Sequence, residues 1–194
     1  IKTKATKNVV KSAKMDFINL GLSEKFEKWH MIETDNFKFY FHKRTKVKDT
    51  TPFTKDRQKP FDSINTFFNA ELPKKIDFYV WNETINYDRR NKIEFGFAIP
   101  ELLIIPTRYF QTIGDEMTHI ISHYSVESQK RAAFINEGIA TFFDLSNRNR
   151  MNMAKKAVSE CDIPIIKMCE KDNIFRSIDP VHSYAIAAAF VESL

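Results

Sequence analysis

The stretch TIGDEMTHIISHYSVESQKRAAFINEGIATFFD, residues Thr112–Asp144, combines helical periodicity with an unusual set of side chains that bind metals or protons. Asp115, His119 and His123 recur every four residues, so a helix places them on one face. Glu116 stands beside them, near enough to contact a water molecule held by Asp115 and His119. The apolar face of this helix is predicted to contain Phe110, Ile113, Met117, Ile120, Ile121 and Tyr124. The pattern suits two metal ligands and a general base.

A second helix is predicted over FINEGIATFFD, whose apolar residues suit packing against the first helix. Glu137 is set among these apolar residues. Burying a carboxylate is costly unless a cation or hydrogen bonds compensate for it. Glu137 is therefore a candidate third ligand.

The two segments resemble the gluzincin metallopeptidases, which comprise the thermolysin-like and aminopeptidase-like zincins. In that family H-E-x-x-H on one helix precedes N-E-x-x-A or N-E-G-x-A on the next, at a spacing close to the one seen here. The counterparts in this chain are DEMTH, residues 115–119, and NEGIA, residues 136–140. The strand expected at GFAIPELLIIP and the later helix SYAIAAAFVESL also have counterparts in the family, so the resemblance covers roughly residues 36–194.

The resemblance implies roles for five residues. Asp115, His119 and Glu137 would bind Zn²⁺, water would be the fourth ligand, and Glu116 would be the general base. Tyr184 resembles the tyrosine that stabilises the oxyanion in some gluzincins, although a buried aromatic with a satisfied hydroxyl fits it equally well. His182 is a weaker candidate for the same role.

The departure from the family lies at Asp115, where gluzincins carry histidine. Aspartate can bind zinc but is shorter, so the metal would have to sit nearer the helix or a water would have to bridge. A carboxylate also adds negative charge, which makes the metal a poorer Lewis acid and its bound water less acidic. The oxygen-richer donor set favours manganese or another hard divalent ion, and a degenerate site would hold none.

His119 and His123 form an alternative ligand pair with the same four-residue spacing. In that arrangement Ile120 occupies the position of the base, and the glutamate is lost from catalysis. The other interpretation of His123 is a hydrogen-bonded histidine near the end of the helix.

The rest of the chain predicts an α+β fold, and the resemblance makes it zincin-like: a small N-terminal mixed β-sheet with a helix, then a helical C-terminal half. Strands are expected at NFKFYFHK, KKIDFYVW and GFAIPELLIIP, with Pro100 favouring an edge or bulge, and a helix is expected to start at Pro60. Residues 1–34 are expected to form a basic amphipathic helical segment, and residues 35–194 a zincin-like peptidase domain. The last helical stripe, Ile186, Phe190 and Leu194, has no stop signal, so we expect the natural protein to continue.

The amino-acid composition limits the kinds of partner and the cellular location expected for the protein. The chain has 194 residues and a net charge of +5, but its lysines and arginines are scattered among 25 acidic residues, without a nucleic-acid-binding motif. No apolar run approaches the roughly 20 residues that span a bilayer. Cys161 and Cys169 are either buried thiols or a disulfide across a bent segment. The start at Ile1 and the peptidase resemblance favour a secreted or cell-envelope protein, and a cytoplasmic location stays open.

Two functions follow. The first is a metal-dependent peptidase that acts on a peptide or protein substrate and uses Glu116 as general base. Its activity would be weakened by Asp115. The second is an inactive pseudopeptidase that serves as a peptide-binding or interaction module. Nucleic-acid binding is not expected.

Overall fold

A computed structural model of the chain describes residues 29–41, 49–81, 96–125, 131–160 and 162–194. Two compact units are distinguished: unit 1 comprises the described parts of Ile1–Lys55 and Leu72–Gln111, and unit 2 those of Asp56–Glu71 and Thr112–Leu194. The first holds a β-sheet and the second consists mainly of helices, so the predicted α+β class is confirmed. The basic helical segment predicted over residues 1–34 lies almost wholly outside the described residues.

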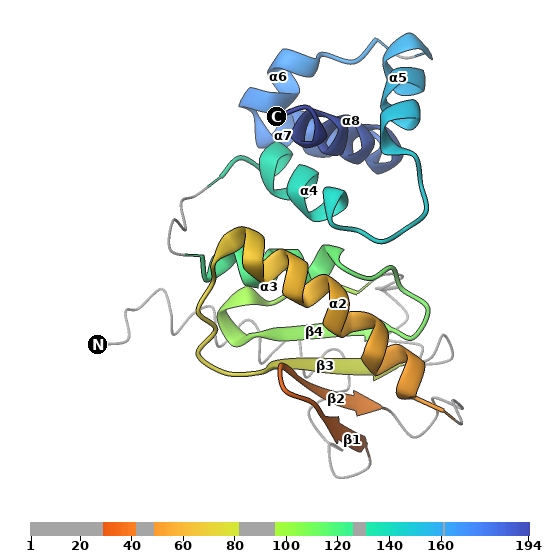
Figure 1. Cartoon of the computed structure of the whole chain (residues 1–194). Helices are drawn as coiled ribbons and strands as arrows, with labels where there is room; N and C mark the ends of the chain where they lie inside the picture. Colours follow the sequence, from red (N-terminus) through yellow and green to blue (C-terminus); the bar gives the residue numbers. More distant parts are fainter. Residues whose placement is uncertain (1–28, 42–48, 82–95, 126–130, 161) are drawn as a thin grey trace, which may run out of the picture. The chain divides into compact units, whose positions relative to one another are not determined.

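Unit 1 is built on a four-stranded sheet with the strand order β1-β2-β3-β4 (Figure 1). Its strands are β1 His30–Glu33, β2 Phe37–Phe41, β3 Ile76–Trp81 and β4 Ile104–Arg108. The β1–β2 pair is antiparallel, whereas β2–β3 and β3–β4 are parallel. The sheet is therefore mixed, as expected, and β4 is the last strand in this order among the described residues.

The alternation in β2 directs three phenylalanines to one face of the sheet. Phe37, Phe39 and Phe41 are buried, while Lys38 and Tyr40 between them are half-buried. Phe39 stacks on Phe78 of β3 with ring centroids 5.2 Å apart. The period-two pattern predicted this strand and its buried face correctly.

Helix α2, Thr51–Phe68, begins nine residues before the expected start at Pro60. The carboxylate of Asp49 accepts a hydrogen bond from the Thr51 amide at 2.9 Å, and Pro52 lies in the first turn. Both features are typical of helix N-termini. Pro60 instead lies inside the helix, where its ring is buried. The prediction was wrong because it used the second of two prolines as the start.

The single strand expected at GFAIPELLIIP is also wrong. Pro100–Leu102 form a 3-10 turn, and Leu103 adopts a left-handed conformation with φ 54°. This turn reverses the chain, so Ile99 pairs antiparallel with Ile104, the first residue of β4. Pro100 ends the extended segment because it cannot continue the hydrogen-bond ladder.

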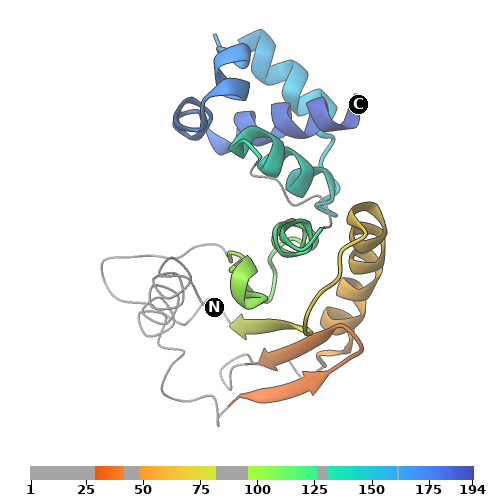
Figure 2. The ribbon, with the colours of Figure 1, turned by 90° about the vertical axis from the view of Figure 1, so that its left-hand side faces the viewer.

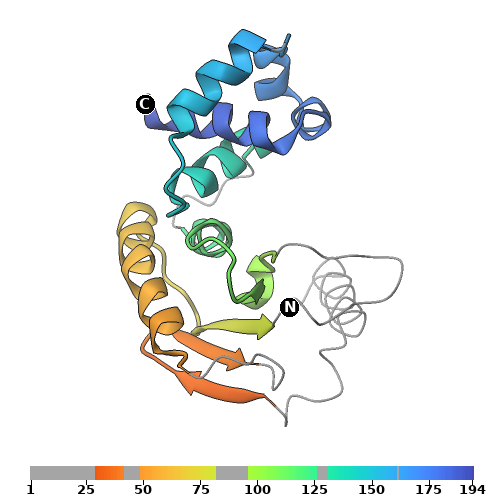
Figure 3. The ribbon, with the colours of Figure 1, turned by 90° about the vertical axis from the view of Figure 1, so that its right-hand side faces the viewer.

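Unit 2 contains six helices in its described part after residue 112. They are α3 Asp115–His123, α4 Ala133–Phe142, α5 Arg150–Glu160, α6 Ile165–Glu170, α7 Asp172–Ser177 and α8 Pro180–Glu192. Two side views show α8 lying along α4, with α5 against α8 (Figures 2 and 3). Phe134, Phe175 and Ala187 are among the buried residues of this helical core.

The buried faces of α3 and α8 differ from the apolar faces predicted for them. Phe110 precedes α3 and is 83% exposed, so it does not belong to the buried face of that helix. In α8 the buried residues are Ser183 and residues 185–189, which include the predicted Ile186. Phe190 and Leu194, which were predicted to continue its apolar face, are exposed. Small alanines replace large residues there because α8 packs closely on α4.

Two further observations concern the described residues alone. Cys169 carries a free thiol, and Cys161 lies outside the description. None of the described helices combines the length and apolar character needed to cross a membrane.

Candidate active site

The start of α3 is fixed by the end of α4. The carbonyl of Ile113 accepts a hydrogen bond from the Leu145 amide at 2.8 Å. Gly114 has a φ of 113°, and a Cβ there would stand 2.1 Å from the carbonyl oxygen of Phe143. Only glycine tolerates both the conformation and this approach. The contact sets where Asp115 and the rest of α3 begin.

Helix α4 approaches α8 through Gly138. A Cβ at this position would lie 2.7 Å from the carbonyl oxygen of Ala187 on α8. Glycine is unfavourable inside a helix, so its presence here reflects the close packing of the two backbones. Glu137, the residue before it, is held at a defined distance from α8.

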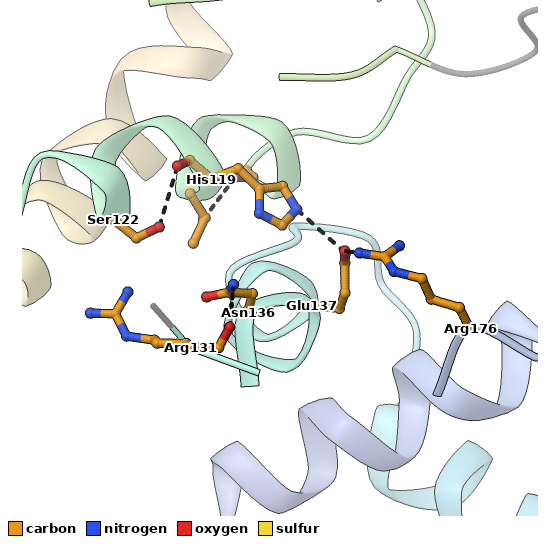
Figure 4. A network of polar contacts seen from close by, with 8 residues as sticks. His119, Ser122, Arg131, Asn136, Glu137 and Arg176 are labelled. Atoms are coloured by element: carbon orange, nitrogen blue, oxygen red, sulfur yellow. Dashed lines mark hydrogen bonds and ion pairs between the residues drawn. The ribbon is translucent and has the colours of Figure 1, made fainter. Parts of the chain in front are cut away.

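His119 and Glu137 converge from α3 and α4, and Arg176 of α7 reaches the same carboxylate (Figure 4). The His119 Nε2 lies 3.4 Å from Glu137 Oε2, and Arg176 approaches Glu137 Oε1 at 3.8 Å. The Glu137 side chain is only 13% exposed, whereas that of Arg176 is 61% exposed. The carboxylate of Glu137 therefore has two basic neighbours, the His119 imidazole and the Arg176 guanidinium.

Asp115 lies in the same electrostatic environment. Burial raises the pKa of its carboxyl to about 6; the charge of His119 opposes this shift, and those of Glu137 and Asp144 add to it. Burial also acts to lower the pKa of His119, but its hydrogen bond with Glu137 and the charges of Glu137, Asp115 and Glu116 outweigh burial, so this pKa is raised. Both groups therefore hold their protons to a higher pH than the isolated side chains would.

Tyr184 of α8 faces this cluster. Burial, then the charges of Glu137 and Asp115, raise the pKa of its hydroxyl to about 12. Its ring stacks on Phe175 with centroids 5.6 Å apart and an interplanar angle of 8°. Tyr184 thus remains a protonated hydrogen-bond donor at neutral pH, held by its ring.

The expected ligands fit a metal ion in part. Two ligands of a tetrahedral zinc ion, each about 2.0–2.1 Å from it, lie about 3.4 Å from one another. The His119–Glu137 distance of 3.4 Å matches this geometry. Within the described ranges, however, no group of three or more His, Cys, Asp or Glu side chains is arranged to hold a metal ion. Asp115 is therefore close to the pair without completing a three-donor set.

The other predicted residues lie as follows. Glu116 is half-buried in the first turn of α3, where its charge acts on His119. His123 is exposed at the end of α3, with its ring 5.0 Å from that of Tyr124. His182 is half-buried near the start of α8. The contact with Glu137 is made by His119, the histidine common to both ligand hypotheses.

Sequence reasoning missed three charged residues of this region. Asp144 and Arg150 form an ion pair of 2.6 Å, with side chains 8% and 14% exposed, and both act on the charge of Asp115. Arg176 is the third. Asp144 closes the motif-bearing stretch and could have been noticed. Arg150 and Arg176 stand on separate helices, and no spacing rule connects them to α3.

Comparison with known proteins assigns the chain to no family. No protein-family model matches the chain, and no curated protein has a significantly similar sequence.

Proposed function

We propose that the protein is a gluzincin-type metallopeptidase, weakened by Asp115, in which His119 and Glu137 bind a divalent metal ion. The observation that carries the proposal is the approach of His119 Nε2 to Glu137 Oε2, 3.4 Å apart, from the two helices that bear the matching motifs. A mixed sheet followed in sequence by helices supports a zincin-like fold. The substrate class is a peptide or protein.

Asp115 would have to move its carboxylate towards His119 and Glu137 to take the third ligand position, because the three side chains do not form a donor set as they lie. Its burial and its neighbours Glu137 and Asp144 make the carboxylate costly to ionise, which a divalent cation would offset. When bound, the metal would supply Lewis-acid activation of a water molecule. Because the Asp115 side chain is shorter than histidine and negatively charged, we expect the site to bind zinc more weakly than a site with histidine at this position. We also expect its preference to shift towards manganese.

Two further side chains would serve the reaction. Glu116, half-buried and beside His119, would accept a proton as general base. Tyr184 is protonated at neutral pH, as tyrosines ordinarily are, and its raised pKa of about 12 keeps it so in alkaline solution, so it would donate a hydrogen bond to an oxyanion. Neither role requires the histidine that Asp115 replaces.

The test measures metal content and cleavage together. Protein purified without chelator should contain close to one equivalent of zinc or manganese, and it should cleave members of a mixed peptide library. Glu116→Gln should abolish cleavage and retain the metal, because it removes the base and spares the ligands. Asp115→His should raise metal affinity. A folded Asp115→His variant that binds no metal would show that the ligand assignment is wrong.

A second candidate function is an inactive peptide-binding module on the same fold. It is favoured by Asp115 itself and by the pairing of Glu137 with both His119 and Arg176, which satisfies the carboxylate from within the chain. In this case the protein would bind peptides without cleaving them. Binding would also be unchanged by EDTA, whereas a peptidase would lose its activity.

A further inference from the structure

Four phenylalanine rings of unit 2 form a continuous row at the ends of two helices. Phe67 and Phe68 are the last two residues of α2, in the part of that helix that belongs to unit 2, and Phe142 and Phe143 lie at the end of α4. Ring centroids lie 5.2 Å apart for Phe142 and Phe143, 5.3 Å for Phe143 and Phe67, and 5.0 Å for Phe67 and Phe68. We call these four side chains the aromatic row.

The aromatic row exposes apolar surface at two of its rings. Phe67 is 61% exposed and Phe142 is 45% exposed, and both contact the half-buried Phe143, so the exposed surface is continuous. Leu145, two residues after Phe143, is 55% exposed. Since a whole aromatic side chain covers roughly 150–250 Å², these three exposed side chains present on the order of 300 Å². Single exposed apolar residues are ordinary, whereas a continuous patch of this size is often functional.

The backbone beneath one end of the row is held in place. The Leu145 amide donates a hydrogen bond to the Ile113 carbonyl at 2.8 Å, and Asp144 forms its 2.6 Å ion pair with Arg150. The segment that carries Phe143 and Leu145 therefore cannot turn these side chains inward without breaking both contacts. A surface that is already ordered loses little conformational entropy when a partner covers it.

Arg131 supplies a positive charge at the other end of the row. Its guanidinium carbon lies 5.6 Å from the centroid of the Phe68 ring, a cation–π contact, and its side chain extends away from Glu137 (Figure 4). Arginine keeps its charge at every accessible pH. Arg131 forms no ion pair with another described residue. A carboxylate of a ligand can therefore pair with it without displacing an acidic group that the structure describes.

We propose that the aromatic row is a docking site for a segment of a partner protein that carries large apolar side chains beside a carboxylate. The apolar side chains cover Phe67 and Phe142, and the carboxylate pairs with Arg131. Aromatic and arginine side chains contribute much of the binding energy at many protein interfaces. The site uses neither His119 nor Glu137, so the proposal does not depend on metal binding or peptide cleavage.

Size and charge favour this occupant over two others. A stable dimer buries about 800 Å² on each partner, more than twice the apolar surface that the row and Leu145 expose, so a second copy of the chain would need further contacts. Anchoring to an anionic membrane usually needs several basic residues beside the apolar ones, and the cation in contact with the row is Arg131. A short segment fits both the small area and the single charge.

The test is selection from a displayed library of short random peptides on the immobilised protein. Peptides that also bind the doubly substituted Phe67→Ser/Phe142→Ser protein are first removed. We expect the remaining pool to be enriched in Phe, Leu or Trp together with Asp or Glu. The affinity of an enriched peptide, measured by fluorescence anisotropy, should fall at least about tenfold in each single variant, because each removes a ring that the peptide covers.

Matched variants separate the apolar and the charged contributions. Ile166→Ser changes another exposed apolar side chain of unit 2, on α6, and should leave the affinity for the peptide unchanged. Arg131→Gln should weaken binding about threefold, the size expected for an exposed ion pair. Lys155→Gln removes a positive charge from the exposed face of α5 and should have no effect. Replacing the carboxylates of the peptide by amides should abolish the difference between the wild type and Arg131→Gln.

The proposal is refuted if no peptide is enriched after the subtraction, or if Phe67→Ser and Phe142→Ser bind an enriched peptide as tightly as the wild type. Vesicles of phosphatidylcholine, with and without phosphatidylserine, test for a membrane, and light scattering tests for a dimer. Sedimentation with vesicles or dimerisation that the double variant loses, without an enriched peptide, would assign the row to that occupant and overturn the proposal. None of these measurements reports metal content or cleavage, so this proposal and the proposed function fail independently.

Discussion

The sheet of unit 1 and the helices α3, α4, α7 and α8 of unit 2 bury side chains of opposite character. In the sheet, Phe37, Phe39 and Phe78 form a purely apolar cluster with ring centroids 5.2 to 5.4 Å apart. In the helices, close backbone packing brings Asp115, His119 and Glu137 into a largely buried space. The first arrangement stabilises the fold, whereas in the second burial and neighbouring charges raise the pKa values of Asp115 and His119. Such a contrast is typical of a scaffold and a functional site.

The largest effect should come from the apolar cluster. Phe39→Ala removes a ring that is fully buried against Phe37 and Phe78, so we expect a loss of about 3–5 kcal/mol in the free energy of unfolding. Urea denaturation monitored by far-UV circular dichroism measures it. Phe110→Ala is the matched control in unit 1, because Phe110 is 83% exposed, and it should cost less than about 1 kcal/mol. Equal losses in the two variants would contradict the assignment of the core.

The contact between α4 and α8 offers the second prediction. Gly138→Ala would place a Cβ 2.7 Å from the Ala187 carbonyl oxygen, and a backbone atom cannot move aside without shifting α8. We expect a loss of about 2–3 kcal/mol in the free energy of unfolding, by the cost of overpacking. Helix propensity alone predicts the reverse, a gain of about 1 kcal/mol. Urea denaturation decides between them, and a stabilised variant would show that α4 and α8 are not held this closely.

The difference between the two regions also explains what the sequence could predict. Alternation in β2 and β3 identified their positions, and the four-residue spacing of Asp115 and His119 identified α3, because each pattern is local. Strand β1 was missed because its exposed residues lack any alternation. The approach of His119 to Glu137 was expected from the position of Glu137 among apolar residues, and from the gluzincin resemblance. The roles of Arg150 and Arg176 depend on how separate helices pack, which no local pattern encodes.

The third prediction concerns the cost of burying Asp115. Its pKa is about 6 in the folded protein, above the ordinary value near 3.8, so between these values the folded state binds more protons than the unfolded state. Stability therefore falls as the pH rises from about 4 to 6, and the raised pKa of His119 extends the decline above pH 6.5. Asp115→Asn removes the first contribution. In EDTA, we expect the variant to exceed the wild type by about 1–2 kcal/mol at pH 7.5 and to differ little at pH 4.

The measurement is urea denaturation of both proteins at half-unit steps between pH 4 and pH 8. Asp162→Asn changes an exposed carboxylate of the same unit and should leave the pH profile parallel to that of the wild type. If Asp115→Asn also gives a parallel profile, the carboxylate is solvated rather than buried beside His119 and Glu137. A flattened profile would instead show that the helical unit keeps Asp115 at a cost in stability. A cost of that kind is expected of a group retained for binding rather than for folding, because burial without a compensating cation disfavours its charged form.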